Sequence, residues 1–130
     1  MVSVAQTLQI LLVEDQPDVT RGYTILLNRR GYAVTAVASV EAAKRALASA
    51  DFDLLLCDYC LDDGTAIDLI TWLNATGSRL TSLCVTGYGD EIAKQCRLAG
   101  FGGVLTKPVK AEMLEAAIAS LVIRAGNEVD

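Results

Sequence analysis

Short apolar runs alternate with amphipathic segments along the whole chain, and this alternation constrains the fold more strongly than any other feature of the sequence. The apolar runs cover residues 8–13, 33–37, 52–57, 80–85 and 104–105. The segment after each run carries apolar side chains at helical spacing. This pattern predicts an α/β fold, in which helices cover both faces of a doubly wound parallel sheet of five strands.

Residues typical of helix ends mark several of the expected boundaries. Pro17 suits the first turn of the helix after the first strand, and Ser39 is expected to cap the helix after the second. Gly100 is expected to end the fourth helix. The 130 residues are enough for one domain. We therefore expect a single domain over residues 1–130, with a core over about 8–124 and short flexible termini.

Charge and composition exclude several classes of function. The net charge is −5, which argues against a surface for nucleic acid or for an anionic membrane. No apolar run approaches the ~18 residues of a membrane span, and residues 1–6 do not resemble a signal peptide. We therefore expect a cytoplasmic protein with reduced cysteines. The chain has no histidine, which excludes histidine bases and histidine-ligated zinc.

Ionisable or hydroxyl side chains follow four of the five expected strands. Glu14 and Asp15 follow the first, Asp58 the third and Lys107 the fifth, while Thr86 follows the fourth. In a parallel sheet of this kind the carboxyl ends of the strands form the ligand-binding edge. Two carboxylates ~4 Å apart repel by about 4 kcal/mol at an effective dielectric constant of about 20. The cluster therefore predicts a bound cation, and hard oxygen ligands favour Mg²⁺.

The same residues are suited to phosphoryl transfer. A carboxylate can act as the nucleophile and form an aspartyl phosphate, and Asp58 is the best candidate because it stands alone at the end of its strand. Mg²⁺ can neutralise the incoming oxygens. Thr86 can donate a hydrogen bond to one phosphoryl oxygen, and Lys107 can pair with another.

These residues resemble the receiver domain of two-component response regulators, from about Gln9 to Leu121. The resemblance implies the flavodoxin-like (βα)5 fold with strand order 2-1-3-4-5. It is carried by four blocks in the expected order, which are Leu11-Leu12-Val13-Glu14-Asp15, Leu55-Leu56-Cys57-Asp58, Val85-Thr86-Gly87-Tyr88 and Leu105-Thr106-Lys107-Pro108.

The resemblance implies that Asp58 accepts a phosphoryl group from a histidine kinase or a phosphotransfer protein. It implies that Asp15 ligates Mg²⁺ directly and Glu14 through water, and that Asp58 also belongs to the metal site. The backbone carbonyl of Cys60 would complete the metal site.

The resemblance also assigns the residues that switch the domain. Thr86 would be the switch hydroxyl and Lys107 the lysine that contacts the phosphoryl group. Val104 occupies a position that is usually aromatic, so the usual coupling between the threonine and an aromatic ring is absent here. Tyr88 and Cys60 flank the phosphoryl pocket in the family and modulate it.

A receiver domain of this kind acts by binding other proteins. The expected partners are the phosphodonor and a downstream protein target, and the expected state is a monomer or a weak dimer. The domain would phosphorylate and dephosphorylate itself but turn over no separate substrate, so it is not expected to be an enzyme. It would be a stand-alone regulator or a receiver excised from a longer chain, such as a hybrid histidine kinase.

Three other interpretations start from particular segments. Cys57 and Cys60 have the spacing of a thiol–disulfide motif, but nearby carboxylates would raise the thiol pKa, so buried apolar cysteines are favoured. A flavin phosphate is disfavoured, because residues 14–17 offer two acids and a proline where free N–H groups are needed. The remaining alternative is a receiver-like interaction module that works independently of phosphorylation.

Overall fold

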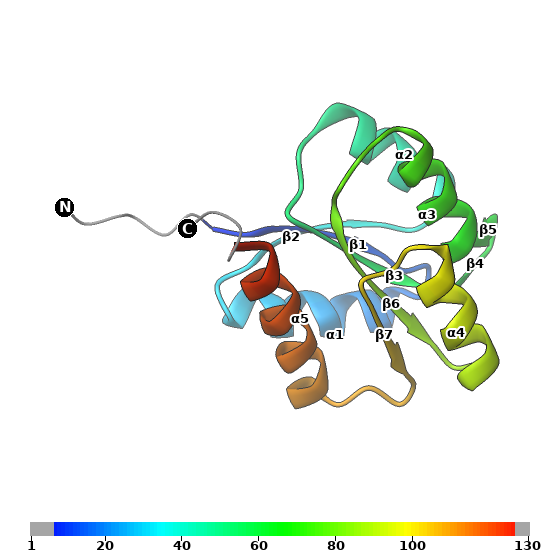
Figure 1. Cartoon of the computed structure of the whole chain (residues 1–130). Helices are drawn as coiled ribbons and strands as arrows, with labels where there is room; N and C mark the ends of the chain where they lie inside the picture. Colours follow the sequence, from blue (N-terminus) through cyan, green and yellow to red (C-terminus); the bar gives the residue numbers. More distant parts are fainter. Residues whose placement is uncertain (1–6, 127–130) are drawn as a thin grey trace.

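The predicted parallel sheet is present in the computed structural model, which describes residues 7–126. Its strand order is β2-β1-β3-β6-β7 (Figure 1), and counting only the strands of this sheet along the chain gives 2-1-3-4-5. The predicted fold class and strand order are therefore confirmed. The expected flexible termini fall almost entirely outside the described residues. The strands are β1 (Gln9–Val13), β2 (Ala33–Val37), β3 (Leu54–Asp58), β6 (Thr81–Thr86) and β7 (Gly103–Thr106).

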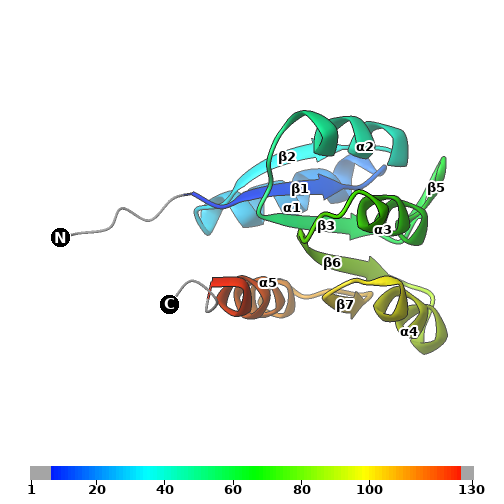
Figure 2. The same ribbon diagram turned by 45° about the horizontal axis from the view of Figure 1, so that its top comes forward.

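Helices cover both faces of the sheet (Figure 2). Alternate residues of each strand face opposite ways, so Leu11 and Val13 pack with α2, α3 and α4, whereas Ile10 and Leu12 pack with α1 and α5. Within residues 7–126, no helix is long and apolar enough to cross a membrane. The helices are α1 (Pro17–Arg29), α2 (Val40–Ser49), α3 (Ala66–Ala75), α4 (Asp90–Ala99) and α5 (Ala111–Gly126).

The central strand β3 runs farther toward the functional edge than the sequence indicated. Every residue of this strand is buried, as expected for a strand covered on both faces. The strand extends to Asp58, and the next amide, of Tyr59, donates a hydrogen bond of 2.8 Å to the carbonyl oxygen of Val85. Asp58 is therefore held by the ladder itself, and its backbone position is fixed.

A small hairpin follows Asp58, and the sequence did not predict it. Strands β4 (Cys60–Leu61) and β5 (Gly64–Thr65) pair in antiparallel fashion. Thr65, the last residue of this hairpin, is the N-cap of α3 and forms a capping box with Asp68. A side chain at Gly64 would lie 2.9 Å from the Asp68 carboxylate, so the turn needs glycine there.

The C-terminal ends of α3 and α4 are joined by one side chain. The Asn74 amide donates a hydrogen bond of 2.9 Å to the carbonyl oxygen of Ala99. Gly100 ends α4 with a φ of +124°, and a Cβ there would lie 2.7 Å from the Asn74 amide nitrogen. The other end of α4 starts at Gly89 with no side-chain cap. The C-terminal end of α4 therefore has a side-chain bond to α3, while Ile92 and Ala93 near its start are held by packing against the core.

Candidate functional site

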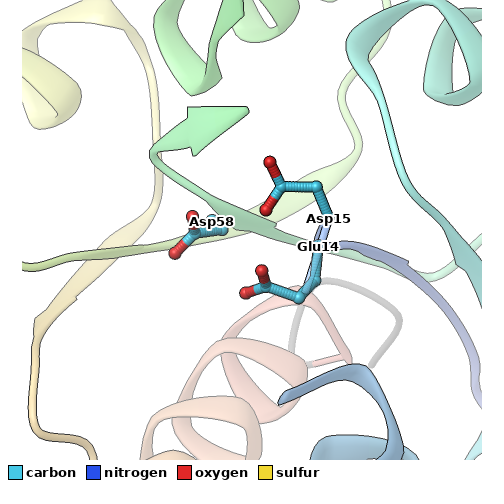
Figure 3. Close-up of side chains that lie close together, drawn as sticks. All are labelled: Glu14, Asp15 and Asp58. Carbon is cyan, nitrogen blue, oxygen red and sulfur yellow. The ribbon is translucent and has the colours of Figure 1, made fainter. Parts of the chain in front are cut away.

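Three carboxylates converge at the carboxyl end of the sheet, as the sequence predicted. Glu14 and Asp15 follow β1, and Asp58 ends the neighbouring strand β3, so the side chains point into one space (Figure 3). One oxygen of each lies within 4.8 Å of the others. Glu14 is only 3% exposed and Asp58 8%, so water screens their mutual repulsion poorly.

Glu14 shows that this cluster fits a divalent cation. Its Oε2 accepts a 3.0 Å hydrogen bond from the Gln16 amide. Its Oε1 is buried and has no hydrogen-bond partner within residues 7–126. Burial raises the pKa of Glu14, the Gln16 bond lowers it in part, and the charge of Asp58 raises it further. An unpartnered buried oxygen beside two other carboxylates matches the hard oxygen donors that Mg²⁺ prefers.

Lys107 places a positive charge directly on Asp58. Its Nζ lies 2.8 Å from Oδ1 of Asp58, and its amide donates a 2.8 Å hydrogen bond to the carbonyl oxygen of Thr86. Partial burial lowers the pKa of Lys107, but the hydrogen bond and the charge of Asp58 outweigh it, so the pKa is raised overall. The ammonium group therefore stays charged beside a carboxylate.

A cavity of about 380 Å³ opens above these groups. Three of its lining residues were not predicted as site residues from the sequence: Gln16, Tyr59 and Gly87, of which Gly87 stands in one of the four blocks. Cys60 lines the cavity together with Asp15 and Asp58. The full lining is Asp15, Gln16, Asp58, Tyr59, Cys60, Gly87, Tyr88 and Lys107.

The predicted switch residues lie at different depths around this cavity. Thr86 is 1% exposed, and its Oγ1 accepts a 3.0 Å hydrogen bond from the Tyr88 amide. Tyr88 is 63% exposed and meets Tyr59 edge to face, with ring centroids 5.6 Å apart. Val104 is not among the lining residues; it is half-buried and packs against the core cluster under α2, α3 and α4.

Comparison with known proteins identifies the family. The sequence matches the model of the family described as "Response regulator receiver domain" over residues 10–119. The chain belongs to this receiver family.

Two curated relatives of this chain are named as regulatory proteins. The "Response regulator protein PilR" of Pseudomonas aeruginosa is 32% identical over 111 residues, which are 85% of this chain and 25% of PilR. The "Phosphoglycerate transport system transcriptional regulatory protein PgtA" of Salmonella typhimurium is 34% identical over 102 residues, which are 77% of this chain and 24% of PgtA. The chain thus spans about a quarter of the length of these relatives.

A solved structure supports the receiver fold independently of sequence. The signal receiver domain of the putative Luxo repressor protein from Vibrio parahaemolyticus superposes with a TM-score of 0.89 at 23% sequence identity. The match covers 95% of this chain and 95% of that one.

No disulfide joins the four cysteines of this receiver domain. All four are free thiols. Burial raises the pKa of Cys57 well above its ordinary value, and the charges of Asp58 and Glu14 raise it further, which suppresses the nucleophilic thiolate. Cys57, Cys84 and Cys96 are buried, whereas Cys60 is exposed at the rim of the cavity. Three of the four cysteines are therefore small apolar core residues, as favoured from the sequence.

Proposed function

We propose that this receiver domain is the phosphoacceptor of a two-component phosphorelay and that Asp58 carries the phosphoryl group. The observation that supports the proposal best is the 2.8 Å pair between Lys107 and Asp58 inside a cluster of carboxylates. A carboxylate oxygen of Asp58 attacks the phosphorus of a phosphohistidine on a histidine kinase or phosphotransfer protein. The P–N bond breaks, and the imidazole leaves with its electron pair.

The surrounding side chains then stabilise the charge on the transferred group. The Lys107 ammonium pairs with one phosphoryl oxygen. The Thr86 hydroxyl uses its oxygen to accept from the Tyr88 amide, so its own O–H is free to donate to another phosphoryl oxygen. Thr86 ends β6, the neighbour of β3, and Lys107 follows β7 on the far side of β6, with its Nζ 2.8 Å from Asp58.

The carboxylates of Glu14, Asp15 and Asp58 and the backbone carbonyl of Cys60 would hold Mg²⁺. When bound, Mg²⁺ supplies positive charge that offsets the negative oxygens at the site. The orphaned Oε1 of Glu14 supports this assignment, because an ion or its water would satisfy it.

The phosphoryl group changes the charge of a nearly buried site, and we propose that a downstream protein reads this change. Thr86 and Tyr88 are adjacent to the site and link it to the start of α4. Val104 is too small to swing in and out as an aromatic ring does, so the surface around Tyr88 is the better candidate for the output.

Intact mass tests the proposal. Incubation with Mg²⁺ and phosphoramidate, a small phosphodonor, is expected to add one phosphoryl group to the wild-type chain. Asp58→Asn is expected to gain none. Chelation of Mg²⁺ is expected to abolish the gain in the wild type. A wild-type chain that stays unmodified while its amide NMR spectrum is unchanged by Mg²⁺ and beryllofluoride would overturn the proposal and favour a phosphorylation-independent interaction module.

A further inference from the structure

The hairpin after Asp58 is tied to the start of α2 by one carboxylate. Asp63 lies in the turn between β4 and β5. Its Oδ1 accepts a 2.8 Å hydrogen bond from the Val40 amide, and its Oδ2 accepts a 3.0 Å bond from the Glu41 amide. These two amides belong to the first turn of α2, which has no helical partners for them. The two bonds also lower the pKa of Asp63, so the carboxylate stays charged.

The hairpin is held at two further points. Leu61 is 5% exposed and belongs to the core under α2, α3 and α4. On the other side, Thr65 and Asp68 form the capping box of α3. Gly64 lies so close to both helices that a Cβ there would be 2.9 Å from Asp68 and 3.3 Å from Val40. The hairpin is therefore wedged between the N-terminal ends of α2 and α3.

The same hairpin begins at the phosphoryl cavity. Cys60, the first residue of β4, lines this cavity together with Asp58 and Asp15. Tyr59 is fixed on both sides, because its carbonyl oxygen accepts a 2.7 Å bond from the Ala66 amide and its own amide bonds to β6. Only residues 59–62 separate Asp58 from Asp63. A shift of the Cys60 backbone thus has a short and well-ordered path to α2.

We propose that Asp63 is a positioning residue for the metal-binding loop and that the hairpin couples occupancy of the Asp58 site to the N-terminal end of α2. This inference rests on the proposed function of that site. Coupling between two sites is reciprocal. If the Asp63 bonds favour the loop geometry that binds Mg²⁺, then Mg²⁺ strengthens the Asp63 bonds by the same factor.

Three variants distinguish a positioning role of Asp63 from two simpler explanations, which are the loss of a charge near the site and the loss of stability of α2. Asp63→Ala removes both bonds to α2. Asp62→Ala removes the same charge from the same turn, and Asp62 is exposed and makes no hydrogen bond or ion pair within residues 7–126. Ser39→Ala removes the other cap of α2, the 3.0 Å bond from the Ala42 amide to Ser39 Oγ, without touching the hairpin. Mg²⁺ affinity is measured for each by amide NMR titration.

Asp63→Ala is expected to weaken Mg²⁺ binding about fivefold, at the lower end of typical coupling, and each control less than twofold. If Asp62→Ala weakens Mg²⁺ binding as much as Asp63→Ala does, the effect comes from the lost charge. If Ser39→Ala weakens it as much, the effect comes from the stability of α2. Either result overturns the inference, while the proposed function stands. A wild-type chain that does not bind Mg²⁺ overturns both.

Hydrogen exchange measured on the wild-type chain gives a second test, which does not require any variant to fold. Saturating Mg²⁺ is expected to slow exchange of the Val40 and Glu41 amides about fivefold, by the same reciprocity. The Gly31 amide, which bonds to Asn28 in the turn after α1, serves as the reference. Unchanged exchange at Val40 and Glu41, with Mg²⁺ bound, overturns the inference.

Discussion

Replacing Glu14 with glutamine is expected to stabilise the metal-free protein, although it removes a native ionic group from the functional site. At neutral pH Glu14 is a buried carboxylate beside two others, and one of its oxygens has no hydrogen-bond partner within residues 7–126. Glutamine keeps an acceptor for the Gln16 amide and adds an amide group that can donate to a neighbouring carboxylate. The substitution thus converts a repulsion into a hydrogen bond.

The size of the effect follows from the distances. At the 4.8 Å that bounds the three ligand oxygens, two unit charges repel by about 3.5 kcal/mol at an effective dielectric constant of about 20. Glu14 faces two such charges, but the Lys107 ammonium, 2.8 Å from Asp58, cancels a large share. We therefore expect Glu14→Gln to raise the free energy of unfolding by about 1–3 kcal/mol at pH 7.

The pH dependence has a defined sign. Burial raises the pKa of Glu14 in the folded state above its ordinary value of 4.5. The ionised group therefore destabilises the fold above its folded-state pKa, and this penalty vanishes below the unfolded-state pKa, where Glu14 is protonated in both states. The stability difference between Glu14→Gln and wild type is expected to be largest at pH 7 and to disappear as the pH falls to about 4.

Urea unfolding at pH 7 in the presence of a chelator provides the measurement. Glu112→Gln is a matched control, because Glu112 is exposed in the first turn of α5 and carries the same charge; its stability is expected to change by no more than about 0.5 kcal/mol. Saturating Mg²⁺ is expected to stabilise the wild type by about 2.7 kcal/mol at 100 times its dissociation constant, and the Glu14→Gln variant less. A variant no more stable than wild type without metal would refute the repulsion argument.

Three further predictions concern the ion pair, the end of α4 and the core. Lys107→Met is expected to lower the free energy of unfolding by an amount that is constant below about pH 10.5. This loss is expected to shrink as the pH rises through the raised folded-state pKa of Lys107. If urea unfolding shows the same loss of stability at alkaline pH, the ion pair with Asp58 is contradicted. Gly100→Ala is expected to lower the free energy of unfolding by about 1–3 kcal/mol, because of the positive φ and the clash with Asn74. In thermal unfolding, the double variant with Asn74→Ala is expected to recover part of this lost stability. If the effects of the two substitutions simply add, the contact between the two residues is contradicted. Leu56→Ala, at a side chain 1% exposed, is expected to cost about 2–5 kcal/mol in chemical denaturation, and a loss below about 1 kcal/mol would contradict its place in the core.

The convergence of the site could be predicted because it depends on topology rather than on side-chain detail. Once the five strands are parallel, their carboxyl ends share one edge, and Asp15, Asp58 and Lys107 follow from their place after three of them. The proximity of Glu14, Asp15 and Asp58 and the contact between Lys107 and Asp58 agree with that expectation. The roles of these residues stay predictions.

The hairpin could not be predicted in the same way. Strands of two residues carry no periodic pattern that a sequence could reveal. Asp63 accepts a hydrogen bond from the amide of Val40, 23 positions away. No local sequence motif therefore predicts that Asp63 caps α2. Val104 is half-buried opposite Cys84 on β6 and packs against the core under α2, α3 and α4; its part in switching stays a prediction.

The Asn74 bond fastens α4 at the end far from the cavity at Asp58, so a tilt of this helix would pivot on that end. Its 10 residues give a length of about 15 Å, and the Asn74 bond holds the end at Ala99. A tilt of about 10° around that pivot moves the end beside Tyr88 by about 2.6 Å, while Leu98, which is 77% exposed near the pivot, stays almost where it was. A partner that binds α4 near Leu98 would therefore stay bound during the tilt, whereas a partner that binds near Asp90 would have to move with the helix or dissociate.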